Sequence, residues 1–271
     1  MNKALLKRIV FGLLFSITII LSVLFYKETF FAVFFLILLL AMREFYLIAK
    51  LAGAMPLSWL GIITGATVFS SGYMHSSFKD AYWMYFIILE LSLVLICEIF
   101  RETKTTVLNI GSLFSGILYI ALPLTIIQYL FYIEYNPYLI LSIFFIIWAN
   151  DSGAYIIGSL FGKHKLAPKI SPNKTWEGAI GGALSSLTLG YFLPEKLLNF
   201  PIYERLILVI VIIVFSTLGD LFQSKLKRSV NIKDSGKILP GHGGILDRID
   251  SMLFAFPAVF VYLGIIGYET F

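Results

Sequence analysis

Apolar stretches long enough to cross a lipid bilayer recur along the whole chain, with short polar segments between them. Each holds close to the roughly 20 apolar residues that a helix needs to span the hydrocarbon core. The stretches cover residues 9–26, 29–49, 57–74, 81–99, 107–133, 138–160, 176–194, 204–223 and 251–268. This pattern predicts an all-α, polytopic integral membrane protein with about nine transmembrane helices.

The composition excludes several other classes of protein. Hydrophobic residues make up 59% of the 271 residues and charged residues only 14%, whereas soluble domains carry roughly 25% charged residues. An ordinary soluble domain and a disordered chain are therefore both excluded. The single cysteine, Cys97, cannot form an intrachain disulfide, and no paired Cys and His spacing typical of zinc sites is present.

The positions of the basic residues predict a cytoplasmic N-terminus, because Lys and Arg in short loops favour the cytoplasm. With that orientation, 16 of the 21 Lys and Arg residues fall in inner segments, four fall in outer loops, and Arg43 lies within the second stretch. The net charge of +5 is then explained by membrane orientation, and we expect no nucleic-acid partner. The first stretch follows Lys3, Lys7 and Arg8 without a small-residue cleavage site, so we expect an uncleaved anchor.

The chain reads as one domain with two unlike halves. Residues 1–135 have short loops and are predicted to form a transmembrane scaffold that includes possible oligomer contacts. Residues 136–271 carry two long polar inner loops, 161–175 and 224–250. We therefore expect the chemistry to reside in the second half.

Acidic residues inside or beside the spans each need an explanation, because a carboxylate at the bilayer centre costs about 2.5–3.5 kcal/mol. Six of them are predicted to gather at the cytoplasmic mouth of the last four spans: Asp151, Glu177, Asp220, Asp234, Asp247 and Asp250. Carboxylates mixed with basic residues at a hydrated interface suit Mg²⁺ and polyphosphates. Glu44 and Glu90 are interpreted instead as solvated acids or partners of nearby lysines.

The two inner loops contain candidate anion-binding features. In 224–250, Gly241, Gly243 and Gly244 surround His242, and glycines let backbone amides approach an anion closely. In 161–175, Ser171 and Pro172 fit an N-cap followed by proline at the first helical position, which predicts a helix N-terminus beside Lys174. An ordinary helix start, with lysines at the interface and Trp176 as an anchor, explains the second pattern equally well.

The segment 224–250 resembles the signature of the phosphatidate cytidylyltransferases, also called CDP-diacylglycerol synthases. The stretches WANDSGAYIIGSLFGKHKLAPKISPNKTWEG (148–178) and GDLFQSKLKR (219–228) resemble further blocks of that family. The resemblance is specific over residues 148–250, and over the first 135 residues it extends only to hydrophobic spans. The signature positions are filled by Ser224, Lys227, Arg228, Lys233, Asp234, Gly236, Pro240, His242, Gly243, Gly244, Asp247, Arg248 and Asp250.

This resemblance implies transfer of a cytidylyl group from CTP to phosphatidate, giving CDP-diacylglycerol and pyrophosphate, with Mg²⁺ required. It also implies a multi-pass protein of the cell membrane with its site facing the cytoplasm, and relatives suggest a homodimer. Many relatives carry Glu where this chain has Gln223, and some carry Gln where it has Glu177, so neither residue is predicted to be catalytic.

Roles for individual residues follow from the same resemblance. The family's metal-binding aspartates correspond to Asp220 and Asp247. Lys227, Arg228, Lys233 and Arg248 are candidates for holding the triphosphate and the leaving pyrophosphate, and His242 for orienting a phosphate oxygen. Asp151 and Lys174 are candidates for the lipid phosphate or a second cation. The remaining predicted substrate-binding residues are Ser224, Asp234, Gly243, Gly244 and Asp250.

Two other functions stay open from the sequence. A CTP-dependent lipid kinase needs the same metal, basic residues and membrane acceptor, but it releases CDP where a cytidylyltransferase releases pyrophosphate. A cation-coupled transporter uses buried acids as ion ligands. A transporter predicts acids near mid-membrane and interrupted spans in matching halves, and the sequence shows neither.

Overall fold

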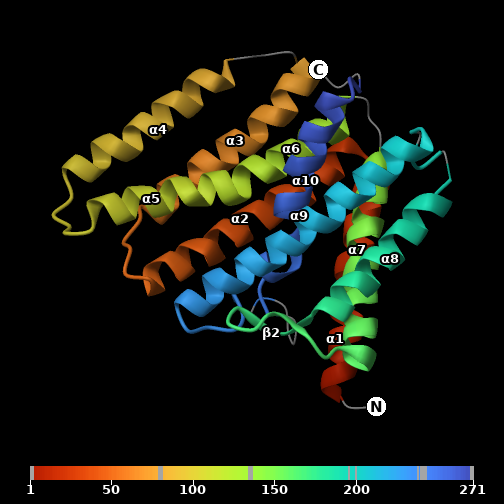
Figure 1. Ribbon diagram of the computed structural model, residues 1–271. Helices are drawn as coiled ribbons and strands as arrows, with labels where there is room; N and C mark the ends of the chain where they lie inside the picture. Colours follow the sequence, from red (N-terminus) through yellow and green to blue (C-terminus); the bar gives the residue numbers. More distant parts are fainter. Residues whose placement is uncertain are drawn as a thin grey trace. The chain divides into compact units, whose positions relative to one another are not determined.

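The computed structural model describes residues 3–78, 82–133, 137–194, 196–198, 200–236, 238 and 243–268. Within these ranges the chain is helical apart from its loops and one short hairpin, so the all-α expectation is confirmed except for that hairpin (Figure 1). The elements are α1 (Lys3–Leu24), α2 (Lys27–Leu51), α3 (Ser58–Phe78), α4 (Trp83–Ile99), α5 (Thr106–Gly116), the π-helix η1 (Ile117–Ala121), α6 (Leu122–Ile133), α7 (Pro137–Phe161), β1 (Lys165–Ala167), β2 (Ser171–Thr175), α8 (Trp176–Phe192), α9 (Ile202–Ser229) and α10 (Leu246–Ile265).

Each of the nine predicted apolar stretches overlaps a helix. The fifth stretch is a continuous run of α5, η1 and α6. Among the described residues, five segments are long and apolar enough to cross a membrane: Lys27–Leu51, Thr106–Tyr132, Pro137–Phe161, Ile202–Ser229 and Leu246–Ile265. Helices α4 and α8 have 17 residues each, at the lower limit for a span. The chain is a multi-pass membrane protein.

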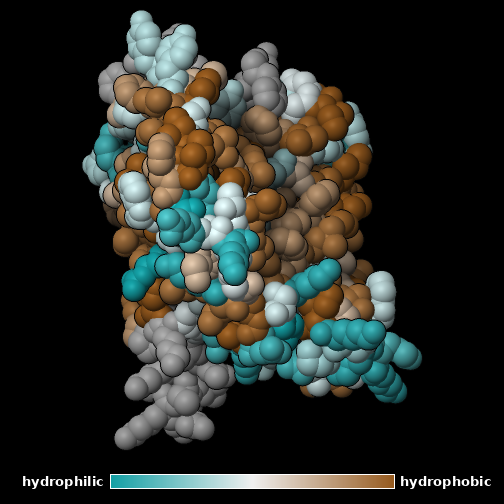
Figure 2. Space-filling model, turned by 90° about the vertical axis from the view of Figure 1, so that its left-hand side faces the viewer, coloured by the Kyte–Doolittle hydropathy of each residue, from teal (hydrophilic) through white to brown (hydrophobic). Residues whose placement is uncertain are grey.

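The outer surfaces of the helices are apolar, as expected for contact with lipid. Along α4, large side chains such as Phe86, Leu89 and Ile96 are exposed, and Ile210 and Val214 are exposed on α9. Figure 2 shows hydrophobic residues covering much of one face, with hydrophilic residues confined to patches. Exposed apolar surface of this extent is not tolerated in water and marks the surface that lipid covers.

The π-helix has a local cause in the sequence. Pro123 lies just after it in α6, and proline has no N–H to donate to the carbonyl four residues earlier. The ring also crowds that carbonyl, and a wider turn relieves the crowding. The apolar run 107–133 therefore stays helical through its proline.

The helices form two compact units. The first comprises Met1–Ile133 and Ser229–Ile249. Its core is aromatic: the Phe30 ring stacks on those of Phe34 and Phe131, with centroids 4.3 and 4.0 Å away. The buried hydroxyl of Tyr46 donates to the carbonyl of Leu113 at 3.0 Å and ties α2 to α5. Stacked rings and one satisfied polar group thus hold α2, α5 and α6 together.

The second unit comprises Glu134–Arg228 and Asp250–Phe271. Helices α7 and α8 pack through glycines: a Cβ at Gly182 would lie 2.6 Å from the carbonyl oxygen of Asn150, and one at Gly178 would lie 2.8 Å from that of Ala154. Gly178 and Gly182 are therefore packing contacts between the two helices. Such small residues let helix backbones approach closely inside a membrane.

A β-hairpin joins α7 to α8 where the sequence suggested an earlier helix start. Strand β1 pairs antiparallel with β2, and Ala167 lies opposite Ser171. The predicted Ser171 N-cap is therefore wrong. The N-cap is Thr175, whose hydroxyl oxygen accepts the N–H of Gly178 at 3.1 Å. The fixed φ of Pro172 suits an extended strand as well as a first helical turn, so the dipeptide alone could not locate the helix start.

We predict that Gly182→Val destabilises the protein, because its side chain would meet a helix backbone that cannot rotate away. Overpacking of this kind costs about 1–3 kcal/mol, so the melting temperature in detergent should fall. The matched control is Gly111→Val on α5, because a Cβ at Gly111 has no atom within 4 Å. Equal melting temperatures for the two variants would contradict the close packing of α7 and α8.

Candidate active site

Asp220, near the end of α9, is the centre of a polar cluster in the second unit. The ammonium of Lys174 lies 2.6 Å from its Oδ2 atom. The hydroxyl of Ser224, one turn later on α9, donates to Oδ1 at 3.3 Å. The Asp220 side chain is 33% exposed and that of Lys174 is 26% exposed, so solutes can reach the pair. Three of the predicted site residues are therefore in contact.

The hairpin and a hydrogen bond between helices position this cluster. Lys174 lies in β2, one residue before the Thr175 cap, so the hairpin fixes its approach to α9. The side-chain amide of Asn150 on α7 donates to the hydroxyls of Ser216 and Thr217, both at 3.4 Å. These hydroxyls lie about one turn before Asp220 on α9. Helix α7 thus holds the part of α9 that carries the aspartate.

Asp250 connects Asp220 to a further predicted acid, Asp151. The half-buried Asp250 on α10 lies close enough to Asp220 and Asp151 to be repelled by their charges, and close enough to Lys227 to be attracted. Gly219 permits this proximity, because a Cβ there would lie 2.5 Å from the Asp250 carbonyl oxygen. Residues from α7, β2, α9 and α10 therefore contribute to one mixed-charge cluster: Asp151, Lys174, Asp220, Ser224, Lys227 and Asp250.

Asp247 belongs to the first unit, where it holds the loop that precedes it. Its Oδ2 atom accepts the backbone N–H of Ser235 at 2.8 Å and that of Gly244 at 3.0 Å. Gly243 has a φ of +79°, a conformation that strongly favours glycine. A Cβ there would lie 2.6 Å from Asp247 Oδ2. The loop is thus folded tightly around the Asp247 carboxylate.

The remaining predicted residues lie in different surroundings. Lys233, Asp234, Arg228 and Arg248 are exposed. His242, together with Pro240 and Gly241, lies outside the described residues. Asp220 and Asp247 belong to different units, so their joint use as metal ligands stays a prediction. Within the ranges that the structure describes, no three His, Cys, Asp or Glu side chains group closely enough to hold a metal ion.

The sequence did not predict Glu177 or Gln223 to be catalytic. In the structure, Glu177 forms hydrogen bonds at the start of the hairpin and Gln223 is buried. Glu177 lies 2.5 Å from His164 Nδ1, and its carboxylate also accepts the backbone N–H groups of Lys163 and His164. It therefore clamps the start of the hairpin to the first turn of α8. Gln223 is fully buried within α9.

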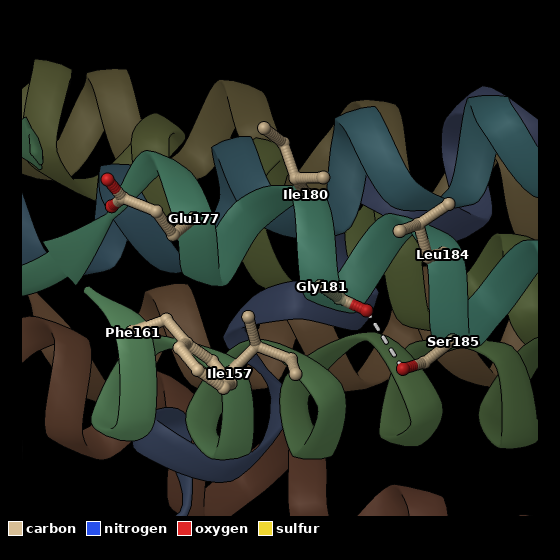
Figure 3. Close-up of a pocket in the computed structure, with 7 residues that line it drawn as sticks. All are labelled: Ile157, Phe161, Glu177, Ile180, Gly181, Leu184 and Ser185. Carbon is tan, nitrogen blue, oxygen red and sulfur yellow. Dashed lines mark hydrogen bonds between the residues drawn. The ribbon is translucent and has the colours of Figure 1, made fainter. Parts of the chain in front are cut away.

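A groove of about 380 Å³ lies between α7 and α8, also in the second unit. Figure 3 shows Glu177 at one end and Leu184 and Ser185 toward the other, with Ser185 donating to the Gly181 carbonyl at 2.8 Å. Its outer residues, such as Phe161 and Ile180, are more than half exposed. The lining is mostly hydrocarbon and suits an acyl chain. The lining residues are Ile157, Phe161, Glu177, Ile180, Gly181, Leu184 and Ser185.

The interpretation of Glu44 as a solvated or lysine-paired acid is wrong. Glu44 is only 2% exposed, and its carboxylate accepts hydrogen bonds from Ser235, Ile245 and Leu246. The signal for this was present, because an acid inside an apolar span must find buried donors. The sequence could not say which donors, since they lie about 200 residues away. Glu90 accepts the hydroxyl of Thr67 at 2.8 Å.

Comparison with known proteins identifies the family of this chain. The family model described as "Cytidylyltransferase family" matches residues 6–266. Similar proteins include the phosphatidate cytidylyltransferase of Staphylococcus haemolyticus, 50% identical over 129 residues, which cover 46% of this chain and 48% of the relative. That of Haemophilus influenzae is 46% identical over 132 residues (45% and 46%), and that of Bacillus subtilis is 50% identical over 121 residues (44% and 45%).

These alignments span about half the length of the curated relatives. The family model, in contrast, extends over nearly the whole sequence, including every predicted site residue. The chain therefore belongs to the cytidylyltransferase family.

Proposed function

We propose that this protein transfers a cytidylyl group from CTP to phosphatidate, forming CDP-diacylglycerol and pyrophosphate for phospholipid synthesis. The observation that carries the proposal is the cluster around Asp220, where Lys174, Ser224, Asp250, Asp151 and Lys227 combine negative and positive charge. Membership of the family and the names of the similar proteins support the same reaction.

The reaction joins a soluble polyanion to a lipid headgroup. A phosphate oxygen of phosphatidate attacks the α-phosphorus of CTP in line with the leaving group, and a new P–O–P linkage forms. The bond from the α-phosphorus to the bridging oxygen breaks, and its electron pair leaves with pyrophosphate. A phosphate monoester has a second pKa near ~6, so the attacking oxygen needs no strong general base. Positioning and charge stabilisation then supply most of the catalysis.

The basic residues fit the nucleotide phosphates. Lys227 is held near Asp250, whereas Arg228, Lys233 and Arg248 are exposed. Guanidinium groups bind phosphate oxygens in pairs, and ammonium groups act as point charges. These side chains neutralise the triphosphate and the departing pyrophosphate, with His242 orienting a phosphate oxygen. The groove beside Glu177 is open to an acyl chain of the lipid.

Mg²⁺ is the proposed cofactor, held by Asp220 and Asp247, with Asp151 available to a second cation. The residues fit this ion: the partly exposed carboxylate of Asp220 already attracts a cation, the ammonium of Lys174. Mg²⁺ needs only one or two protein carboxylates and takes water and substrate phosphates as its other ligands. When bound, it would neutralise charge on the nucleotide phosphates.

The proposed membrane arrangement has nine spans, a cytoplasmic N-terminus and a site that faces the cytoplasm, where CTP is available. The bias of basic residues toward the inner segments and the overlap of each predicted stretch with a helix support it. We also propose a homodimer in the cell membrane, on the resemblance to the family.

We expect purified protein in mixed micelles to incorporate the α-phosphorus of labelled CTP into lipid in the presence of phosphatidate and Mg²⁺. The β- and γ-phosphorus should appear together as pyrophosphate. Thin-layer chromatography of lipid and aqueous phases measures both products. Release of CDP, with the γ-phosphorus in the lipid, would contradict the proposal and identify a lipid kinase.

Removing either predicted metal-binding charge should abolish most of this activity. We expect Asp220→Asn and Asp247→Asn each to lower the turnover number by about 100-fold or more, on the scale of losing one group that stabilises transition-state charge. The matched control is Glu102→Gln, which neutralises an exposed acid in the loop after α4. Near-normal turnover of either aspartate variant, with an unchanged melting temperature, would exclude that aspartate from the site.

The proposed orientation is tested with single cysteines in a Cys97→Ser background. In intact cells, a membrane-impermeant maleimide should label Lys196→Cys, in a predicted outer loop, but should label Lys104→Cys only after the membrane is opened. Mass spectrometry or gel shift measures the labelled fraction. Labelling of both positions from the same side would contradict nine spans.

A further inference from the structure

We propose that Glu44 is a positioning residue: from α2 it anchors both ends of the segment 235–246 and thereby sets the place of Asp247. This inference rests on the proposed function. Among the described residues, the hydrogen bonds of the Glu44 carboxylate come from this segment. Its effect on the reaction would therefore pass through the backbone that surrounds Asp247.

The Glu44 carboxylate is buried and fully engaged. Oε2 accepts the hydroxyl of Ser235 at 2.8 Å and the N–H of Leu246 at 3.0 Å, and Oε1 accepts the N–H of Ile245 at 3.0 Å. Ser235, Ile245 and Leu246 are at most 6% exposed. A buried charge is costly unless charge-assisted hydrogen bonds replace its water, and these three do so.

The N–H groups of Ile245 and Leu246 lie at the start of a helix, where backbone N–H groups need an acceptor from elsewhere. Helix α10 begins at Leu246, and the first N–H groups of a helix have no partner within the helix. A negative charge there also interacts favourably with the helix dipole. Glu44 therefore fixes the first turn of α10, the turn that carries Asp247.

Two glycines make room for the carboxylate. A Cβ at Gly236 would overlap Glu44 Oε1, and a Cβ at Gly244 would overlap Oε2 and the Ser235 hydroxyl. Both glycines belong to the signature of the second half, whereas Glu44 belongs to the second span. Positions 236 and 244 thus need small residues because the Glu44 side chain lies against them. Glu44 itself is not part of the signature.

Glu44 and Asp247 accept hydrogen bonds from the same two parts of the loop, one at Ser235 and one at Gly244 and Ile245. The hydroxyl of Ser235 donates to Glu44 and its N–H donates to Asp247. At the other end, Gly244 donates to Asp247 and its neighbour Ile245 donates to Glu44. Without the Glu44 carboxylate, each part of the loop would lose its hydrogen bond to Glu44. Only the hydrogen bonds to Asp247 would then remain at these two places.

The first test compares Glu44→Gln with Glu90→Gln, which neutralises a carboxylate in α4 that accepts a hydroxyl from Thr67. Glutamine keeps the shape of glutamate but presents an NH₂ group to backbone donors. We expect Glu44→Gln to lower kcat about 10–100-fold, the range for residues that support a metal ligand from outside, and Glu90→Gln to leave it within about twofold. An unchanged kcat for Glu44→Gln would overturn the proposal.

A double-mutant cycle separates positioning from general destabilisation. If Glu44 acts through Asp247, adding Glu44→Gln to Asp247→Asn should lower the residual rate by less than about twofold, because coupled residues are not additive. The full 10–100-fold loss in the Asp247→Asn background would show an independent role and overturn the inference.

Limited proteolysis tests the anchor without any assay of activity. Lys233 is exposed just before the anchored segment, and cleavage after it gives fragments that mass spectrometry identifies. We expect tryptic cleavage at this site to accelerate at least about tenfold in Glu44→Gln, and by a smaller factor in Ser235→Ala, which removes one donor and leaves every charge in place. Unchanged cleavage in both variants would overturn the anchor.

The two proposals fail in different ways. Wild-type protein that forms no CDP-diacylglycerol overturns the proposed function, while the proteolysis result still decides whether Glu44 holds the segment. Conversely, an active wild type with an active, protease-resistant Glu44→Gln variant overturns only the anchor.

Discussion

A carboxylate inside an apolar helical protein is stable only where hydrogen-bond donors or cations meet it. That constraint governs the polar interior of both units. In the first, three donors from one segment satisfy Glu44, and two backbone amides satisfy one oxygen of Asp247. In the second, the ammonium of Lys174 and the hydroxyl of Ser224 meet Asp220. Each of these carboxylates is stabilised by hydrogen-bond donors or a cation from its own unit.

The helix packing of the second unit brings the carboxylates and lysines close to one another. Glycines allow α7 and α8 to pack with their backbones in near contact, and Gly219 allows the same between α9 and α10. The hairpin that joins α7 to α8 directs Lys174 to Asp220. Close packing therefore has a chemical consequence, because it concentrates three carboxylates and two lysines that the chain separates by up to 99 positions.

Such a mixture of charges suits phosphoryl chemistry at a membrane surface. Carboxylates without cations would repel a triphosphate. In the proposed reaction, the carboxylates of the mixed cluster would hold a divalent ion and its lysines would meet phosphate oxygens. The chain belongs to the cytidylyltransferase family, and this arrangement supports the proposed transfer to a lipid phosphate.

The sequence by itself determined the helical membrane spans, because a bilayer demands apolar runs of fixed length that are visible in one dimension. It also predicted the residues around Asp220, since they lie in distinctive motifs. Only the tertiary structure placed the helix start at Thr175, because Pro172 fits a strand as well as a helix. Only the tertiary structure revealed the hydrogen-bond partners of Glu44, because hydrogen bonds across about 200 residues depend on how the chain folds back and leave no local pattern.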